Sequence, residues 1–126
     1  MSIDITPTIL PGRKLITSYG DGLFRFGEET IQGSIFLFPT QVQSWPCQNA
    51  ENLSAESFAP VIAQADEVDI LLLGMGPRML PVSTALRMAL KSHGIVIEPM
   101  DTGAACRTYN VLLAEERRVA AALIAV

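Results

Sequence analysis

The sequence predicts an α/β fold: a three-layer single domain with a mixed central sheet, helices and an additional N-terminal β-layer. Three observations lead to this prediction. Short strand-like segments separated by turns fill residues 13–46, whereas strands and helices alternate through residues 54–126. The apolar run 68–73, followed by Gly74, is typical of a strand covered on both faces. Apolar residues between positions 82 and 90 recur at the spacing of one helix face.

The first half of the chain predicts strands joined by tight turns. Gly20-Asp21-Gly22 lies between two alternating segments and is a hairpin signal. Pro39 ends the third segment, because proline cannot donate to a strand ladder. The expected strands span residues 14–19, 23–26 and 30–38, with a further short strand near Val42.

The second half predicts alternating helices and strands. The expected elements are helices over 54–65 and 82–90, strands over 68–73 and 95–100, a further helix after Asp101-Thr102-Gly103, and a last strand over 119–124. Ser54 is a suitable N-cap for the first helix, and Gly94 is the residue type that ends the second. A right-handed crossover through the second helix makes the strands on either side of it parallel. We expect the strand over 68–73 to be the central one.

The composition of the 126 residues excludes several classes of protein. Nine Lys and Arg residues against 13 Asp and Glu residues give a formal net charge of −4, so we expect no nucleic-acid partner. No stretch reaches the ~20 apolar residues that cross a bilayer, so no membrane insertion is expected. The first residues match neither a signal peptide nor a transit peptide. Two widely separated cysteines, Cys47 and Cys106, predict reduced thiols and a cytoplasmic location.

Few residues have the spacing of a catalytic or cofactor site. His93 is the single histidine, which excludes a multi-histidine metal site. After Gly74-Met75-Gly76, Met79 stands where a dinucleotide-binding turn has its third glycine, so no nucleotide cofactor is expected. Cys106 beside Arg107 could be either a reactive thiol or a buried one. Because no nucleophile, base and orienting group come together, we expect no catalytic residues, no metal and no cofactor, and we favour a protein that is not an enzyme.

A small-anion site is the first candidate for function. The turns 74–78 and 100–103 should leave the sheet from the same carboxyl edge, where α/β proteins commonly bind ligands. Each turn leads into a helix N-terminus, whose unpaired N–H groups favour an anion. Alternatively, the glycines only form tight turns, Asp101 or Thr102 caps its helix, and the arginines are solvated or paired. The candidate ligand-binding residues are Gly74, Gly76, Arg78, Asp101, Thr102 and Arg107.

An uncharged stretch around Trp45 is the second candidate, as a protein-interaction site. Residues 30–50 contain no charged side chain. Interface centres are depleted in charged residues and enriched in tryptophan, which makes Trp45 a plausible anchor for a protein partner. Alternatively, the segment is a core strand followed by an uncharged loop, with Trp45 folded inward.

Several short motifs along the chain resemble those of a known family. They are Gly33-Ser34-Ile35 with Trp45, Leu71-Leu72-Leu73-Gly74-Met75-Gly76, Gly94-Ile95-Val96-Ile97-Glu98-Pro99-Met100-Asp101-Thr102, Ala105, Thr108-Tyr109-Asn110 and Arg118-Val119-Ala120-Ala121-Ala122-Leu123. The family comprises small bacterial and archaeal proteins of unassigned function together with the mitochondrial complex I assembly factor 3. The resemblance spans nearly the whole chain, although Glu116 occupies a turn where the family's glycine is expected.

The resemblance implies a three-layer α/β fold with a mixed sheet and an additional β-layer, and no established enzyme activity. In the mitochondrial relative the family is associated with assembling respiratory complex I, a role that depends on binding other proteins. Our hypothesis is therefore a non-enzymatic accessory or assembly factor with protein partners that include respiratory-complex components. The alternative is a small-anion-binding protein or enzyme that uses the carboxyl edge of the sheet. An exposed strand edge in the first half would also allow a homo-oligomer.

Overall fold

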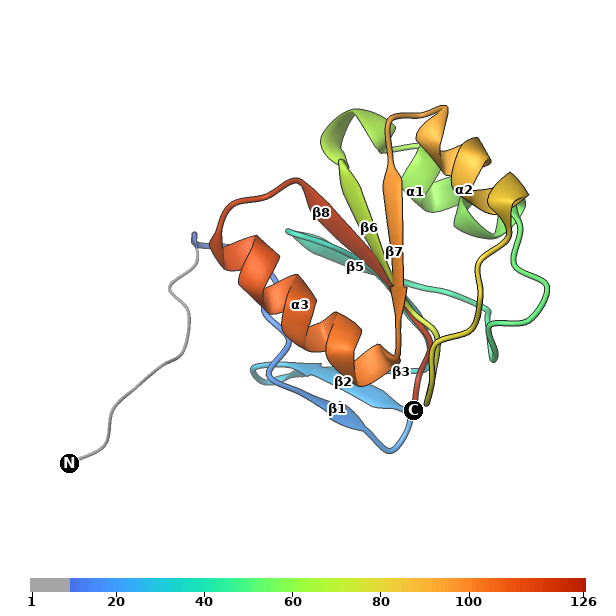
Figure 1. The fold of residues 1–126 in the computed structure, drawn as a ribbon. Helices are drawn as coiled ribbons and strands as arrows, with labels where there is room; N and C mark the ends of the chain where they lie inside the picture. The colour runs from blue at the N-terminus through green and yellow to red at the C-terminus, as the bar shows by residue number, and fades with distance from the viewer. Residues whose placement is uncertain (1–9) are drawn as a thin grey trace.

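The computed structural model describes residues 10–126 as two β-sheets packed with helices (Figure 1). The main sheet has the strand order β5-β4-β8-β6-β7, and the small sheet has the order β1-β2-β3. The main-sheet strands are β4 (Ile35–Phe38), β5 (Gln41–Ser44), β6 (Ile70–Gly74), β7 (Val96–Met100) and β8 (Val119–Leu123). The small-sheet strands are β1 (Ser18–Gly20), β2 (Leu23–Phe26) and β3 (Glu29–Gln32). The helices are the 3-10 helices η1 (Ala55–Phe58) and η2 (Ala65–Glu67) and the α-helices α1 (Ala59–Ile62), α2 (Thr84–Lys91) and α3 (Thr102–Ala114).

The main sheet is mixed, as predicted. β6 runs parallel to both β7 and β8, whereas β4 runs antiparallel to β8 and to β5. Because α2 connects β6 to β7, the predicted parallel strand–helix–strand unit is confirmed. The carboxyl ends of β6, β7 and β8 therefore lie at one edge of the sheet.

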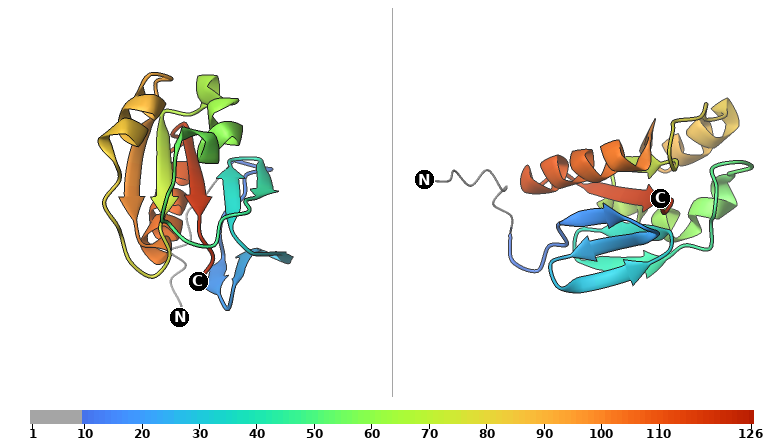
Figure 2. Two further views of the ribbon diagram at one scale, coloured as in Figure 1. Left: turned by 90° about the vertical axis from the view of Figure 1, so that its right-hand side faces the viewer. Right: turned by 90° about the horizontal axis from the view of Figure 1, so that it is seen from below.

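Alternating side chains of the main sheet bury two cores. Leu71 and Leu73 of β6 pack on the face covered by α1 and α2, whereas Leu72 packs on the face covered by α3 and the small sheet. Successive residues of a strand point to opposite faces, so the near-continuous apolar runs fill both cores. Figure 1 shows α3 on one side of the main sheet and α1 with α2 on the other. Figure 2 shows the small sheet as a separate β-layer, which confirms the predicted three-layer arrangement.

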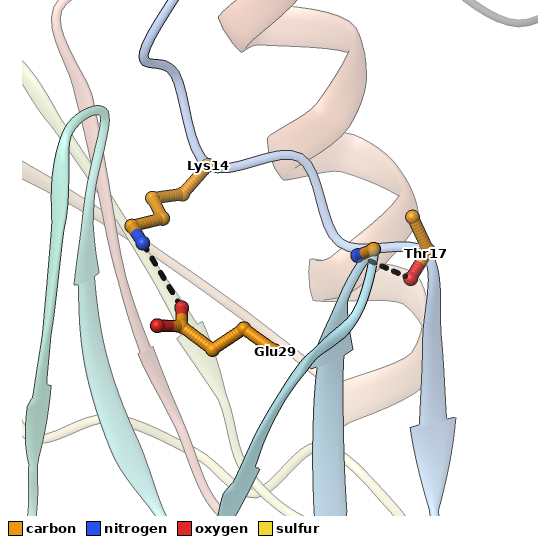
Figure 3. Close-up of polar contacts among 4 residues, drawn as sticks. Lys14, Thr17 and Glu29 are labelled. Carbon is orange, nitrogen blue, oxygen red and sulfur yellow. Dashed lines mark hydrogen bonds and ion pairs between the residues drawn. The ribbon is translucent and has the colours of Figure 1, made fainter.

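The small sheet is connected to the segment before β1 by polar contacts (Figure 3). Lys14 Nζ lies 2.9 Å from Glu29 Oε1, and the Gly27 N–H donates to Thr17 Oγ1 at 3.0 Å. An exposed ion pair of this kind adds about 0–1 kcal/mol. These contacts fix the path of the chain into β1 more than they stabilise the fold.

The strand expected over 14–19 is shorter than predicted, because only its last residues lie in β1. Just before β1, the Thr17 N–H still donates to the Arg25 carbonyl of β2 at 2.8 Å, but Ile16 bonds to α3 instead of to a strand. The Ile16 N–H donates to Asn110 Oδ1 at 3.0 Å, and Asn110 Nδ2 donates to the Ile16 carbonyl at 2.8 Å. A side-chain amide of α3 therefore takes the place of a strand partner.

The prediction of a single strand over 30–38 is wrong. The segment forms β3 and β4, which belong to different sheets. Gly33, with φ +86°, turns the chain between them in a conformation that glycine adopts without strain. The buried Ser34 follows, and its Oγ accepts a hydrogen bond from the Ala125 N–H at 3.0 Å.

Two other expectations need correction. The helix expected over 54–65 is split into η1, α1 and η2, and Pro60 lies in the first turn of α1, where its missing N–H breaks continuous helical bonding. The strand over 68–73, observed as β6, has neighbours on both sides, but the middle strand is β8. Small residues of β8, Ala120 to Ala122, are fully buried between the two cores.

Candidate functional site

The two turns at the carboxyl edge lie against each other and form one junction. The Met75 N–H donates to the Met100 carbonyl at 2.9 Å, and the Thr102 N–H donates to the Gly76 carbonyl at 2.9 Å. The Gly76 N–H in turn donates to Thr102 Oγ1 at 2.9 Å. The start of α3 is thereby fixed to the turn after β6. The candidate residues at this junction are Gly74, Gly76, Asp101 and Thr102.

Thr102 is the centre of the junction and is 0% exposed. Its hydroxyl donates to the Ile124 carbonyl at 2.7 Å while accepting from the Gly76 N–H. A hydroxyl has a single proton, so Thr102 can donate to a ligand only by breaking its bond to the end of β8. The side chain connects three segments that are far apart in the sequence.

Gly74 allows α3 to approach the sheet closely. A Cβ at this position would lie 2.9 Å from Leu123 Cδ2, 3.1 Å from Thr102 Cα and 3.2 Å from Ala105 Cβ. Real Cβ atoms rarely come so near to other atoms, because cores are already packed to high density. Gly76 serves a different purpose, since its φ of +91° lets the turn reverse.

The first turn of α3 uses several of its N–H groups within the protein. Asp101 Oδ1 accepts from the Ala104 N–H at 2.9 Å, and the Asp101 carbonyl accepts from the Ala105 N–H at 3.0 Å. The Thr102 N–H is already bonded to Gly76. A helix start binds an anion through unpaired N–H groups, so this one offers an anion less than an uncapped helix does.

The two candidate arginines are exposed and lie on different segments. Arg78 follows the turn after β6 and has no ion-pair partner among residues 10–126. Arg107 of α3 donates through Nη1 to Tyr19 Oη at 3.3 Å. Tyr19 stands against the first turn of α3, where a Cβ added to Gly103 would lie 2.5 Å from its Oη. The small sheet thus contacts α3 beside the junction.

The thiol next to Arg107 is buried. Cys106 is 2% exposed, and burial raises the pKa of its thiol to about 12 although the neighbouring guanidinium lowers it. The thiolate is the reactive form of cysteine, so Cys106 is a poor nucleophile near neutral pH. Burial also raises the pKa of Tyr109, whose Oη has no hydrogen-bond partner in the described part of the chain.

Trp45 is folded inward. It is 6% exposed, and its ring centroid lies 4.9 Å from that of Phe36 and 5.7 Å from that of Phe58. Trp45 also borders a surface hollow of about 560 Å³, together with Pro46 and Cys47. The structure therefore makes Trp45 mainly a core residue, and the uncharged segment that follows it forms the surface.

One surface feature was not predicted from the sequence. It is a hollow of about 330 Å³ at the amino ends of β6 and β8, and the adjacent pair Arg117-Arg118 was its only signal in the sequence. Its charged lining residues are Arg13, Glu67, Glu116, Arg117 and Arg118. The exposed strand edge expected in the first half is provided by β5, whose outer side has no strand partner within residues 10–126. Between residues 10 and 126, no group of three or more His, Cys, Asp or Glu residues is placed to hold a metal ion.

Comparisons with known proteins identify the family. The family described as "Protein of unknown function (DUF498/DUF598)" matches residues 16–124. The chain belongs to this family. An uncharacterised protein of Rhodobacter capsulatus is 36% identical over 109 residues, which are 86% of this chain and 82% of that protein.

Several relatives of this DUF498/DUF598 chain are named NADH dehydrogenase (ubiquinone) 1 alpha subcomplex assembly factor 3. The protein of Danio rerio is 32% identical over 110 residues, which are 87% of this chain. The human protein is 29% identical over 109 residues, which are 86% of this chain. This chain spans 63% of the Danio rerio protein and 59% of the human one, so both relatives are considerably longer.

Solved structures share the fold of this family member. A Bartonella henselae protein described as an outer membrane protein has a TM-score of 0.84 and 40% identity, covering 92% of this chain and 98% of that chain. A Mth938-like domain from Bordetella pertussis has a TM-score of 0.81 and 28% identity, covering 98% of this chain and 92% of that chain. None of the helices in residues 10–126 has both the length and the apolar character required to span a membrane.

Proposed function

We propose that this DUF498/DUF598 chain is a non-enzymatic protein-binding factor that assists the assembly of a protein complex. The similarity to the assembly factor 3 proteins is the observation that supports this proposal most strongly. It extends over 86% of this chain for the human protein and 97% for the mouse protein, rather than over one motif. Components of a respiratory complex are the proposed partners, and the cytoplasm is the proposed location.

The geometry of the junction also favours binding over catalysis. The groups that looked most reactive in the sequence form bonds within the fold: Thr102 connects three segments, and Asp101 caps α3. Cys106 is buried, and burial raises its pKa. A catalytic site needs groups that reach a substrate in a suitable protonation state, and these residues are poorly suited to that task.

We place the partner surface on the uncharged segment that follows β5. Gln48 and Asn49 are exposed there, and residues 30–50 have no charged side chain. Contact centres of protein interfaces are depleted in charge, so a new charge in this segment should weaken an interface more than a new charge elsewhere. The buried Trp45 anchors the start of this segment to the core through its contacts with Phe36 and Phe58.

Quantitative affinity capture from the native cell tests the proposal. The tagged chain should retain a defined partner at a reproducible ratio, and Gln48→Lys should reduce the amount retained by about tenfold. Val111→Lys is the matched control, because Val111 is 54% exposed on α3, outside the uncharged segment. Equal retention of the partner by both variants would exclude this segment as the partner surface. Capture of no partner, together with turnover of a metabolite by the purified protein, would overturn the proposed binding function.

A second candidate function is small-anion binding at the carboxyl edge. The exposed Arg78, with no ion-pair partner among residues 10–126, is the observation in its favour. Phosphate and small carboxylates should then raise the melting temperature of the wild-type protein, and Arg78→Gln with Arg107→Gln should abolish this shift. A shift that is unchanged in the double variant would exclude both arginines from the site.

A further inference from the structure

The two edges of the main sheet differ in the backbone groups that they present. At the β7 edge, the Val96 N–H donates to the Asp69 carbonyl, so the backbone groups of Val96 point towards β6. Successive residues of a strand direct their backbone groups to opposite sides, so those of Ile97 and Pro99 point outward. Pro99 has no N–H to donate. Arg87 Nη1 already donates to the Ile97 carbonyl at 3.3 Å. One donor is missing and one acceptor is occupied, so another strand cannot extend the sheet here with a complete ladder.

The β5 edge presents a complete set of backbone groups. The Trp45 N–H donates to the Ser34 carbonyl at 2.9 Å, so this pair is a hydrogen-bonded pair of the antiparallel ladder. Hydrogen-bonded and non-hydrogen-bonded pairs alternate, which directs the N–H and C=O groups of Val42 and Ser44 away from β4. Within residues 10–126 no strand pairs with this outer side.

The side chains of β5 do not protect this edge either. Proteins commonly protect an exposed strand with a charged residue or a proline. β5 has the sequence Gln41-Val42-Gln43-Ser44 and contains neither. Two copies of such a strand can approach each other without repulsion between like charges, and their outward donors and acceptors are mutually complementary.

We infer that β5 is a self-association edge, where a second copy of this chain pairs its own β5 in antiparallel orientation. Val42 of one copy faces Ser44 of the other, each exchanging an N–H and a C=O bond with its counterpart. Gln43 then faces Gln43 of the second copy at the two-fold axis. The two main sheets join into one continuous sheet, and the interface is isologous. This inference is independent of the proposed assembly function, because a monomer could still retain a partner and a dimer could lack one.

Charge exchange at Gln43 tests the pairing directly. The oligomeric state is measured by analytical ultracentrifugation over a range of protein concentrations. Wild type should dimerise, whereas Gln43→Lys and Gln43→Glu alone should each raise the dimer dissociation constant by about tenfold or more, because like charges face each other across the axis. An equimolar mixture of the two variants should recover the dimer, now as a heterodimer.

Two further variants keep the result interpretable. Ser44→Pro removes an outward N–H without touching the ladder to β4 and should also give monomers. Val96→Lys adds the same charge to the β7 edge, where Val96 is 51% exposed, and should leave the dimer intact. Circular dichroism shows whether each variant is folded. A monomeric wild type at every concentration that its solubility permits would overturn the inference, as would a dimer that persists in folded Gln43→Lys.

Discussion

The junction at the carboxyl edge and the edge of β5 both have backbone N–H and C=O groups at the border of the main sheet. In the described part of the chain, these groups are hydrogen-bonded at the junction and lack a strand partner at the β5 edge. At the junction, the Gly76 N–H and the Ile124 carbonyl are bonded to the hydroxyl of Thr102, which is fully buried. At the β5 edge, the outward groups of Val42 and Ser44 have no strand partner within residues 10–126. The comparison shows that the residues most suggestive of chemistry stabilise the fold, whereas a plain Gln-Val-Gln-Ser strand retains unused bonding capacity.

Removing the hydroxyl of Thr102 should have the largest effect. Thr102→Val keeps the shape of the side chain but leaves the Gly76 N–H and the Ile124 carbonyl buried without a partner. The free energy of unfolding should fall by about 2–4 kcal/mol. Thr102→Ser is the control, because it keeps the hydroxyl and should lose about 1 kcal/mol or less. Urea unfolding measures both variants, and equal stabilities of Thr102→Val and wild type would show that the junction does not depend on these bonds.

Filling the space at Gly74 tests the close approach of α3 to the sheet. Gly74→Ala places a methyl group 2.9 Å from Leu123 Cδ2 and 3.1 Å from Thr102 Cα. Since Thr102 Cα belongs to the backbone of α3, the helix must move, and we expect a loss of about 1–3 kcal/mol. Thermal unfolding followed by circular dichroism gives the value. A variant as stable as wild type would mean that α3 moves freely on the sheet.

The buried thiol of Cys106 predicts a pH dependence. Burial raises its pKa from 9.0 to about 12, so the stability that the neutral thiol contributes is fully present below pH 9 and is lost as the pH rises towards 12. Relative to Cys106→Ala, the wild type should lose about 1 kcal/mol of additional stability between pH 7 and pH 10. Urea titrations of both proteins across this range measure the difference. Parallel curves would contradict the burial of an un-ionised thiol.

A substitution at the β5 edge should have the smallest effect on the stability of a single molecule. Ser44 is exposed, and its outward backbone groups have no strand partner in the described chain. Ser44→Lys should therefore change the free energy of unfolding by no more than about 0.5 kcal/mol when it is measured at high dilution. A larger loss would show that the edge is already bonded within the monomer.

Much of the fold could be predicted from local patterns. The parallel unit of β6, α2 and β7 follows from the apolar run, the helix period and Gly94, all of which lie close together in the sequence. The break between β3 and β4 was missed although Gln32-Gly33-Ser34 interrupts the apolar residues. A glycine within a strand pattern does not distinguish a bend from a change of sheet, and only the pairing of β4 with β8 separates the two sheets. Glu116 occupies a turn with φ +58°, which explains why a glycine was expected there.

The position of the candidate site could be predicted from the sequence, but the hydrogen bonds that its residues already make within the fold could not. The strand order places the two turns together, and the capping role of Asp101 is a local signal. The bond from Thr102 to the Ile124 carbonyl, however, joins residues 22 positions apart, and no local pattern indicates it. An exposed strand edge in the first half was expected, but the sequence did not indicate that β5 provides it, since that depends on which strand ends the sheet.

Residue-resolved amide hydrogen exchange at two protein concentrations tests the central claim most directly, because it reports the Gly76 and Ser44 N–H groups in one experiment. The Gly76 amide should be strongly protected at both concentrations, since its bond to Thr102 lies inside the fold. The Ser44 amide should exchange rapidly in dilute protein and become protected as the concentration rises and β5 pairs with a second copy. Rapid exchange of Gly76, or a Ser44 amide whose protection does not change with concentration, would contradict the account.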